Sequence, residues 1–232
     1  MRTYVILTIF LSFFSFFEVY SGEAIYIYST KKLPEISSPF YLIEDPQDIC
    51  KFRKVVLYGA ESYKRVQNIL CPNQKRYVAG VLYLSFFYHP KTVYISPLPS
   101  VEVIKRWGNT FVVFDSGIFD FYLDYLEKEL NLFRIKIRNW YELEGVLGKI
   151  KGKGLPLLLL PDPIFLDERA QLILKGYLKE ENISLVNLLG KPLGLSKEVL
   201  LSFSTRRYLQ FIEKVYNEPS YKEGFIYYMS EY

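Results

Sequence analysis

Residues 157–186 constrain the fold of this chain more than any other stretch. Four consecutive leucines, residues 157–160, form an apolar run of strand length that ends at Pro161-Asp162-Pro163. Apolar residues then recur at helical spacing, and a second short apolar run follows at residues 183–186. A strand without polar alternation is typical of a parallel sheet covered by helices on both faces. The stretch therefore predicts a βαβ unit, with the turn at Asp162 on the sheet edge where open α/β folds bind ligands.

The same alternation of strand and helix patterns runs through most of the chain and predicts two successive α/β blocks that meet near Asn109. Residues 32–48 carry three prolines without a sustained period, so they predict an irregular linker. The tyrosine-rich tail, residues 219–232, is expected to dock on the body of the protein or on another protein. The other predicted strands are 24–29, 55–58, 78–84, 92–95, 111–114 and 133–137, and the other helices are 61–70, 97–107, 120–131, 140–150 and 208–216.

Several stretches together resemble a known family. They are the strand, proline turn and helix from residue 157 onward, the sequence Asn-Ile-Ser-Leu-Val-Asn at 182–187, Val-Val-Leu-Tyr-Gly-Ala-Glu-Ser at 55–62, and Phe-Val-Val-Phe-Asp-Ser-Gly at 111–117. In this order they are similar to the ABC-transporter substrate-binding proteins with the type I periplasmic-binding fold, over about residues 53–217. Relatives in that family usually have a further strand and helix before the strand equivalent to 55–58, so the resemblance implies a shortened first lobe.

The resemblance implies two small Rossmann-like lobes with parallel sheets, joined by a hinge near Asn109 and Asn187. In such proteins the lobes close on a small-molecule solute and present it to an ABC permease or another membrane protein. The corresponding division of this chain is a signal peptide at 1–24, lobe 1 at 25–108, lobe 2 at 109–187, and a return to lobe 1 with the tail at 188–232.

The amino terminus predicts export to the periplasm or the outside of the cell. Arg2 is the only charge before Glu18, residues 4–17 are mostly apolar, and small residues at Gly22 and Ala24 suit a signal-peptidase site. About 14 apolar residues are fewer than the ~20 that span a bilayer, which favours a cleaved signal over an uncleaved anchor. A lipoprotein cysteine is absent from this junction, because the first cysteine in the chain is Cys50.

The two cysteines, Cys50 and Cys71, are expected to form a disulfide in an oxidising compartment. His89 is the chain's single histidine, so the set falls short of a structural zinc site, and we expect no metal and no cofactor. A catalytic thiol is disfavoured because it would need a nearby base of the histidine type.

The candidate ligand-binding residues follow predicted strands. They are Ser116 and Gly117 after the strand at 111–114, Gly59 and Ala60 after 55–58, and Ser85 after 78–84. A hydroxyl and backbone N–H groups at a helix start can bind a carboxylate or phosphate, although Ser116 is equally suited to cap a helix. The plain alternative for Gly59 is a tight turn.

Asp162 is the sixth candidate. Two flanking prolines hold it at a strand end, where its carboxylate can bind an amine of a solute or cap the following helix. Both interpretations stay open at this level.

Composition and motifs narrow the function. The net charge of +4 comes from scattered residues rather than basic runs, so nucleic acid is an unlikely partner. The sequence contains no P-loop, no Gly-x-Ser-x-Gly elbow, no His-Glu-x-x-His and no dinucleotide fingerprint. We therefore expect a non-enzymatic, exported solute-binding protein. The alternative is an accessory or protein-interaction module that keeps the fold without a small-molecule ligand, and an exported enzyme that uses carboxylates is a third class.

Overall fold

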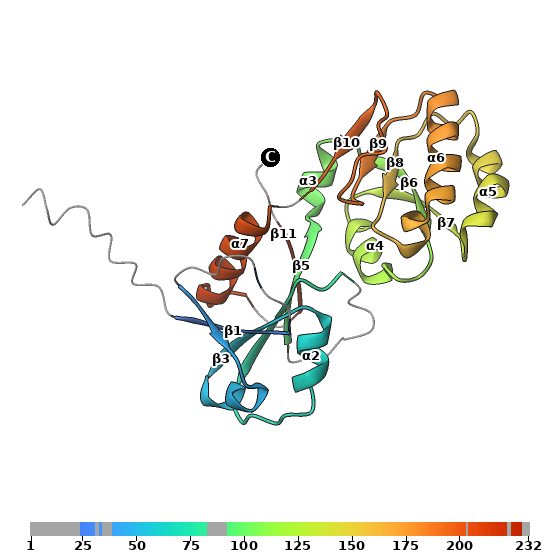
Figure 1. The fold of residues 1–232 in the computed structure, drawn as a ribbon. Coiled ribbons are helices and arrows are strands. Elements are labelled where there is room, and N and C mark those ends of the chain that lie inside the picture. The colour runs from blue at the N-terminus through green and yellow to red at the C-terminus, as the bar shows by residue number, and fades with distance from the viewer. Residues whose placement is uncertain are drawn as a thin grey trace, which may run out of the picture.

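The strands form two parallel sheets, each in its own lobe. The computed structural model describes residues 24–30, 33, 39–82, 92–202, 204–221 and 224–228. Within these ranges one sheet has six strands and the other has five, and all strand pairs are parallel. Figure 1 shows the two sheets in separate bodies joined beside α3. The predicted α/β fold of two small lobes with parallel sheets is confirmed.

The first lobe has the strand order β11-β5-β4-β3-β1-β2. Helix α7 packs against one face of this sheet, while α2 and the 3-10 helix η1 pack against the other. The elements are β1 (Ile25–Ser29), β2 (Phe40–Ile43), η1 (Pro46–Lys51), β3 (Lys54–Tyr58), α2 (Ala60–Val66), β4 (Lys75–Ala79), β5 (Thr92–Pro99), α7 (Thr205–Asn217) and β11 (Gly224–Tyr228).

The second lobe has the strand order β10-β9-β8-β6-β7. Helices α3 and α4 cover one face, and α5 and α6 cover the other. The elements are α3 (Val101–Lys105), β6 (Thr110–Asp115), α4 (Asp120–Leu126), β7 (Asn131–Lys136), η3 (Trp140–Glu142), α5 (Leu143–Ile150), β8 (Leu157–Leu159), η4 (Pro163–Leu166), α6 (Glu168–Glu180), β9 (Leu185–Asn187) and β10 (Glu198–Leu200).

The leucine run behaves as its composition predicts. β8 lies between β9 and β6, and all three of its residues are buried. Leu158 packs into the core under α4, whereas Leu157 and Leu159 pack into the core under α5 and α6. Successive strand residues point to opposite faces, so a strand covered on both sides has no position for a polar residue.

Three segments differ from the sequence-based expectation. The strand predicted at 78–84 is β4 at Lys75–Ala79, so residues 80–82 lie after its end. The segment predicted as an irregular linker contains β2 and the first half of η1, and β2 pairs with β1 along the outer edge of the sheet. The strand predicted at 92–95 continues to Pro99, and Pro97 and Pro99 both lie within it. The register shift in the pairing of β11 with β5 falls at this end, and it matches prolines that donate no ladder hydrogen bond.

The predicted disulfide between Cys50 and Cys71 is present in the structure, with a Cα–Cα distance of 5.1 Å. It ties η1 to the segment that follows α2 in the first lobe. Residues 1–23 of the predicted signal peptide and Ser85 lie outside the described residues. None of the helices in the described ranges has the length and hydropathy of a membrane span.

The predicted docking of the tail is confirmed by β11, which adds to the first sheet beside β5. It also brings Tyr227 against the second lobe. The Tyr227 ring stacks on Tyr125 of α4 at a centroid distance of 4.1 Å, and its hydroxyl donates to the Phe121 carbonyl at 3.3 Å. The Tyr122 hydroxyl of α4 donates to the Pro99 carbonyl at 2.8 Å. The lobes therefore share an aromatic contact in addition to the two chain crossings.

Candidate functional site

A pocket of about 240 Å³ lies where the carboxyl ends of strands from both lobes meet. The first lobe contributes the end of β5 and a residue after β4, and the second lobe contributes the segments after β8, β9 and β10. The carboxyl edge is where open α/β sheets bind ligands. The described residues that line the pocket are Leu82, Pro97, Leu98, Pro99, Pro161, Leu188, Leu189, Gly190, Leu201 and Ser202.

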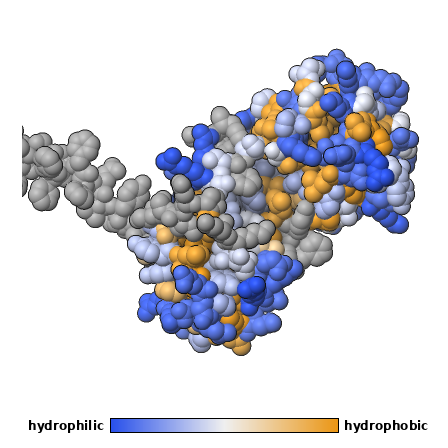
Figure 2. All heavy atoms as spheres, viewed as in Figure 1, coloured by the Kyte–Doolittle hydropathy of each residue, from blue (hydrophilic) through white to orange (hydrophobic). Residues whose placement is uncertain are grey.

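The lining is mainly apolar, since leucines and prolines dominate it and Ser202 supplies the one side-chain hydroxyl among these residues. Apolar side chains also appear between hydrophilic ones on the face drawn in Figure 2. None of the described residues in the lining is charged. Such a surface favours an uncharged or apolar group of a ligand, because a charged group would lose its hydration without gaining an opposite charge.

Ser116 and Asp162 are two predicted site residues that the structure brings together. They follow the neighbouring strands β6 and β8, and the Ser116 hydroxyl donates to Asp162 Oδ2. Asp162 Oδ1 accepts from the Ile164 amide at 3.0 Å, so Asp162 caps η4. Asp162 is 2% exposed, and both of its oxygens accept bonds from the protein. It lies directly after Pro161 of the pocket wall and orients the Ser116 hydroxyl.

The glycine turns at the strand ends use their amides within the protein. The Gly117 N–H donates to Asp115 Oδ1 at 2.7 Å, and the Gly59 N–H donates to the Ala79 carbonyl at 2.8 Å. Both glycines have positive φ, 89° and 87°, which explains the residue type as a turn requirement. Gly59 and Ala60 follow β3 of the first sheet, whereas Ser116, Gly117 and Asp162 follow strands of the second sheet. The described pocket lining contains none of these five residues.

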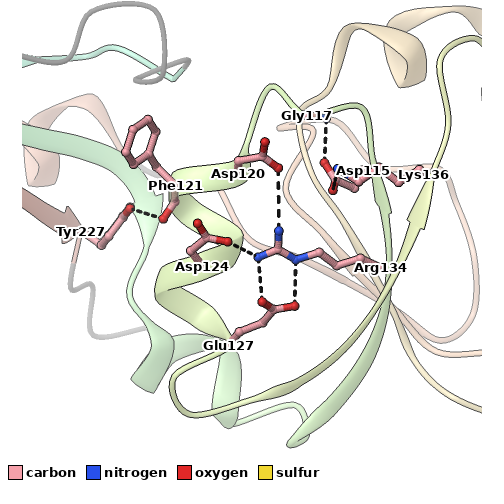
Figure 3. Close-up of polar contacts among 9 residues, drawn as sticks. All are labelled: Asp115, Gly117, Asp120, Phe121, Asp124, Glu127, Arg134, Lys136 and Tyr227. Carbon is pink, nitrogen blue, oxygen red and sulfur yellow. Dashed lines mark hydrogen bonds and ion pairs between the residues drawn. The ribbon is translucent and has the colours of Figure 1, made fainter.

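Asp115 fixes the turn that presents Ser116. Its side chain is fully buried, and Oδ2 lies 3.4 Å from the Nζ atom of Lys136 at the end of β7 (Figure 3). Because β6 and β7 are neighbours, the ion pair holds the two strand ends together. Asp115 thus supports the turn geometry.

Tyr208 supports the first-lobe side of the pocket through hydrogen bonds to the backbone. Its hydroxyl accepts from the Gly80 amide at 2.8 Å and donates to the Ile95 carbonyl at 2.5 Å. Burial raises the pKa of Tyr208, so the group stays a neutral donor and acceptor. At Gly80, which has a φ of 69°, an added Cβ would lie 3.0 Å from the Tyr58 ring, so only glycine permits this close approach. These contacts fix the segment that leads to Leu82 of the pocket.

Asn187 and Glu198 organise the opposite wall of the pocket. The sequence pointed to Asn187 only as a hinge position and did not single out Glu198. Asn187 is fully buried, and its Nδ2 donates to Glu198 Oε1 at 2.6 Å. The Glu198 carboxylate also accepts from the amides of Leu193, Gly194 and Leu195 at 2.8 to 3.2 Å. A glutamate among other charged residues at a strand start carries no distinctive pattern, so only the folded loop identifies its role.

A charge cluster in the second lobe connects α4 with β7 (Figure 3). Arg134 lies among three carboxylates, with Nη2 2.6 Å from Asp124, Nε 2.8 Å from Glu127 and Nη1 3.7 Å from Asp120. Burial lowers the pKa of Arg134, but the hydrogen bonds and charges of Asp124 and Glu127 outweigh this and raise it overall. Carboxylates from α4 surround the guanidinium of β7, which makes the cluster a structural tie between helix and strand.

Among the described residues, no group of three or more His, Cys, Asp or Glu side chains is arranged to hold a metal ion. The site chemistry visible here consists of apolar surface, hydroxyls and one buried, hydrogen-bonded carboxylate beside the pocket. This arrangement can bind and orient a molecule.

Comparison with known proteins gives weak likenesses. No family model matches the sequence, and no curated protein matches it. One similar solved structure is the ligand-free, open form of a substrate-binding protein with adhesive properties from Clostridium difficile, with 13% identity and a TM-score of 0.41. That alignment covers 63% of this chain and 60% of the other, so this chain spans about three fifths of that protein's length.

A second similar structure is an ABC domain in complex with L-Trp from Streptococcus pneumonia. The alignment has 9% identity and a TM-score of 0.40, and it covers 81% of this chain and 76% of the other. The assignment of the fold to this chain rests on its own two parallel sheets.

Proposed function

We propose that this chain is a solute-binding protein that holds a small, largely apolar molecule between its two lobes. The observation that carries the proposal is the pocket at the carboxyl edges, because both lobes contribute to its wall. A site shared by two lobes changes shape when the lobes move, so binding and lobe position are coupled.

The chemistry of the pocket supports a small ligand with an uncharged apolar part. Its volume of about 240 Å³ is below the roughly 300 to 1,000 Å³ of typical ligand pockets, which favours a compact molecule. Ser116, oriented by Asp162, is proposed as a polar contact at the second-lobe edge, with Gly117 in its turn. Gly59, Ala60 and Ser85 remain proposed contacts of the first lobe.

The proposed setting is an exported, non-enzymatic protein that works with an ABC permease or another membrane protein. The apolar amino terminus and the disulfide support export, because disulfides persist in oxidising compartments. Intact mass of the protein from its native host tests this: a mature chain without residues 1 to about 24 supports export by a cleaved signal, and an unprocessed start contradicts it.

Thermal unfolding in the presence of small apolar solutes tests the binding function. A ligand present at 100 times its dissociation constant adds about 2.7 kcal/mol of stability, so a binder raises the melting temperature clearly. Leu189→Trp places a larger side chain in the pocket and should abolish the ligand-induced rise in melting temperature. Leu172→Trp is the matched control, because Leu172 is 69% exposed on α6 and does not line the pocket. If no solute at millimolar concentration shifts the wild-type protein, the proposal fails.

The second candidate is an accessory module without a small-molecule ligand, and the aromatic contact between the lobes favours it. Tyr227, Tyr125 and Tyr122 fasten α4 to the first lobe, which opposes free rotation of one lobe against the other. Stable co-purification of a membrane protein with the unliganded chain would support this candidate, whereas ligand-dependent compaction measured by small-angle X-ray scattering would support the first.

A further inference from the structure

The loop at residues 188–197 connects two neighbouring parallel strands, β9 and β10, without a helix. Parallel neighbours usually need a helical crossover, whose backbone groups satisfy one another. This loop has no such internal ladder, so its buried amides require other partners. Its first residues, Leu188, Leu189 and Gly190, form part of the pocket wall.

Side chains at the two ends of the loop supply those partners. At the β9 end, Asn187 Oδ1 accepts from the Leu189 amide at 2.8 Å, and its Nδ2 donates to the Lys191 carbonyl at 2.9 Å. At the β10 end, the Glu198 carboxylate accepts from the loop amides described above, and the two side chains bond to each other at 2.6 Å. Every one of these bonds terminates on Asn187 or Glu198.

We propose that Asn187 and Glu198 are positioning residues that hold the 188–195 loop in the conformation that forms the second-lobe wall of the pocket. This inference rests on the proposed function, since it assigns specificity for the ligand to a wall that these two residues shape. The pair acts through the loop, because neither residue lines the pocket itself.

The charge of Glu198 matters to this role. Burial raises the pKa of its carboxyl, but the bonds from Leu193, Asn187 and the following loop amides outweigh burial and lower the pKa overall. The other charged residues on or beside the loop are Lys175, Lys179, Lys191 and Lys197. Protonation of Glu198 in acid therefore weakens the hydrogen bonds that hold the loop. Because the pKa is lowered, this happens at pH values below the usual range of a glutamate.

Hydrogen exchange and probe binding together test the proposal on the full chain. Glu198→Gln removes the charge while keeping the size, and we expect amide exchange of residues 189–195 to accelerate at least tenfold, because hydrogen bonds to charged groups are the stronger ones. Binding of the neutral apolar dye N-phenyl-1-naphthylamine should weaken about tenfold. Glu181→Gln is the matched control, since Glu181 also accepts a loop amide, from Gly152 at 3.1 Å, but away from the pocket.

The outcomes separate the inference from the proposed function. If amide exchange is unchanged in Glu198→Gln, the inference is overturned regardless of the dye affinity. If exchange is faster but the dye affinity is unchanged, the positioning role is overturned. If the wild-type protein binds no dye but exchange is faster in Glu198→Gln, then Glu198 does hold the loop, and the result counts against the proposed pocket function. If Glu198→Gln does not fold, amide protection factors of the wild-type protein are measured as the pH is lowered. Loss of protection in residues 189–195 at a higher pH than in the β8 amides supports the positioning role of Glu198, and loss at the same pH refutes it.

Discussion

Replacing Asp162 by alanine separates the structural and functional roles of the strand-end carboxylate. The substitution leaves the Ser116 hydroxyl without its acceptor and the Ile164 amide without its cap. A lost cap costs about 1 kcal/mol, and a lost bond to a charged group costs about 1.5 to 3 kcal/mol. We therefore expect the free energy of unfolding to fall by about 2.5 to 4 kcal/mol, which is larger than a cap acting by itself would give.

Urea denaturation monitored by tryptophan fluorescence measures this change, and Ser116→Ala completes a double-mutant cycle. Residues in direct contact show coupling of about 0.5 to 3 kcal/mol, so the two losses should not add. Purely additive losses, or a loss below about 0.5 kcal/mol for Asp162→Ala, which is the range of ordinary surface substitutions, would refute the hydrogen-bonded pair.

The same variants report on binding. If Asp162 acts by orienting Ser116, both single variants should weaken solute binding to a similar extent in calorimetric titration. A loss of affinity in Asp162→Ala with normal affinity in Ser116→Ala would instead show that the carboxylate touches the solute directly.

Three further predictions concern stability. Reduction of the Cys50–Cys71 disulfide, which closes a separation of 21 residues, should lower the free energy of unfolding by about 3 kcal/mol, measured by denaturation with and without reductant. Glu198 has a lowered folded-state pKa, so its contribution to stability is complete above the unfolded-state pKa of about 4.3 and is lost as pH falls through the folded value. Thermal melts across pH 2 to 6 should show this pH-dependent loss of stability in the wild-type protein and not in Glu198→Gln. Tyr227→Ala removes the stack on Tyr125 and should lower the free energy of unfolding by about 3 to 5 kcal/mol or split unfolding into two transitions. Tyr227→Phe loses only the hydroxyl bond and should cost no more than about 1.5 kcal/mol. A near-neutral Tyr227→Ala would contradict the proposed contact between the lobes.

The identity of the core elements could be predicted from the sequence because burial leaves a local pattern. An all-apolar run such as residues 157–160 has no polar face to expose, so it predicts a strand covered on both sides, and β8 is such a strand. The carboxyl-edge positions of Gly59, Ser116 and Asp162 follow from the same reasoning, since each lies within three residues of the carboxyl end of its strand, β3, β6 or β8. The even cysteine count likewise predicted the disulfide.

The partners of these residues were decided by the tertiary structure. Asp162 meets Ser116 because β6 and β8 are neighbours in the sheet, although 46 residues separate the two side chains in sequence. The pocket wall joins segments that follow four different strands, and its leucines and prolines look like ordinary core or turn residues in the sequence. Glu198 gains its role only when a loop without a helix folds its amides around the carboxylate. Periodicity records whether a side chain is buried, but only the order of strands in the sheets determines what it is buried against.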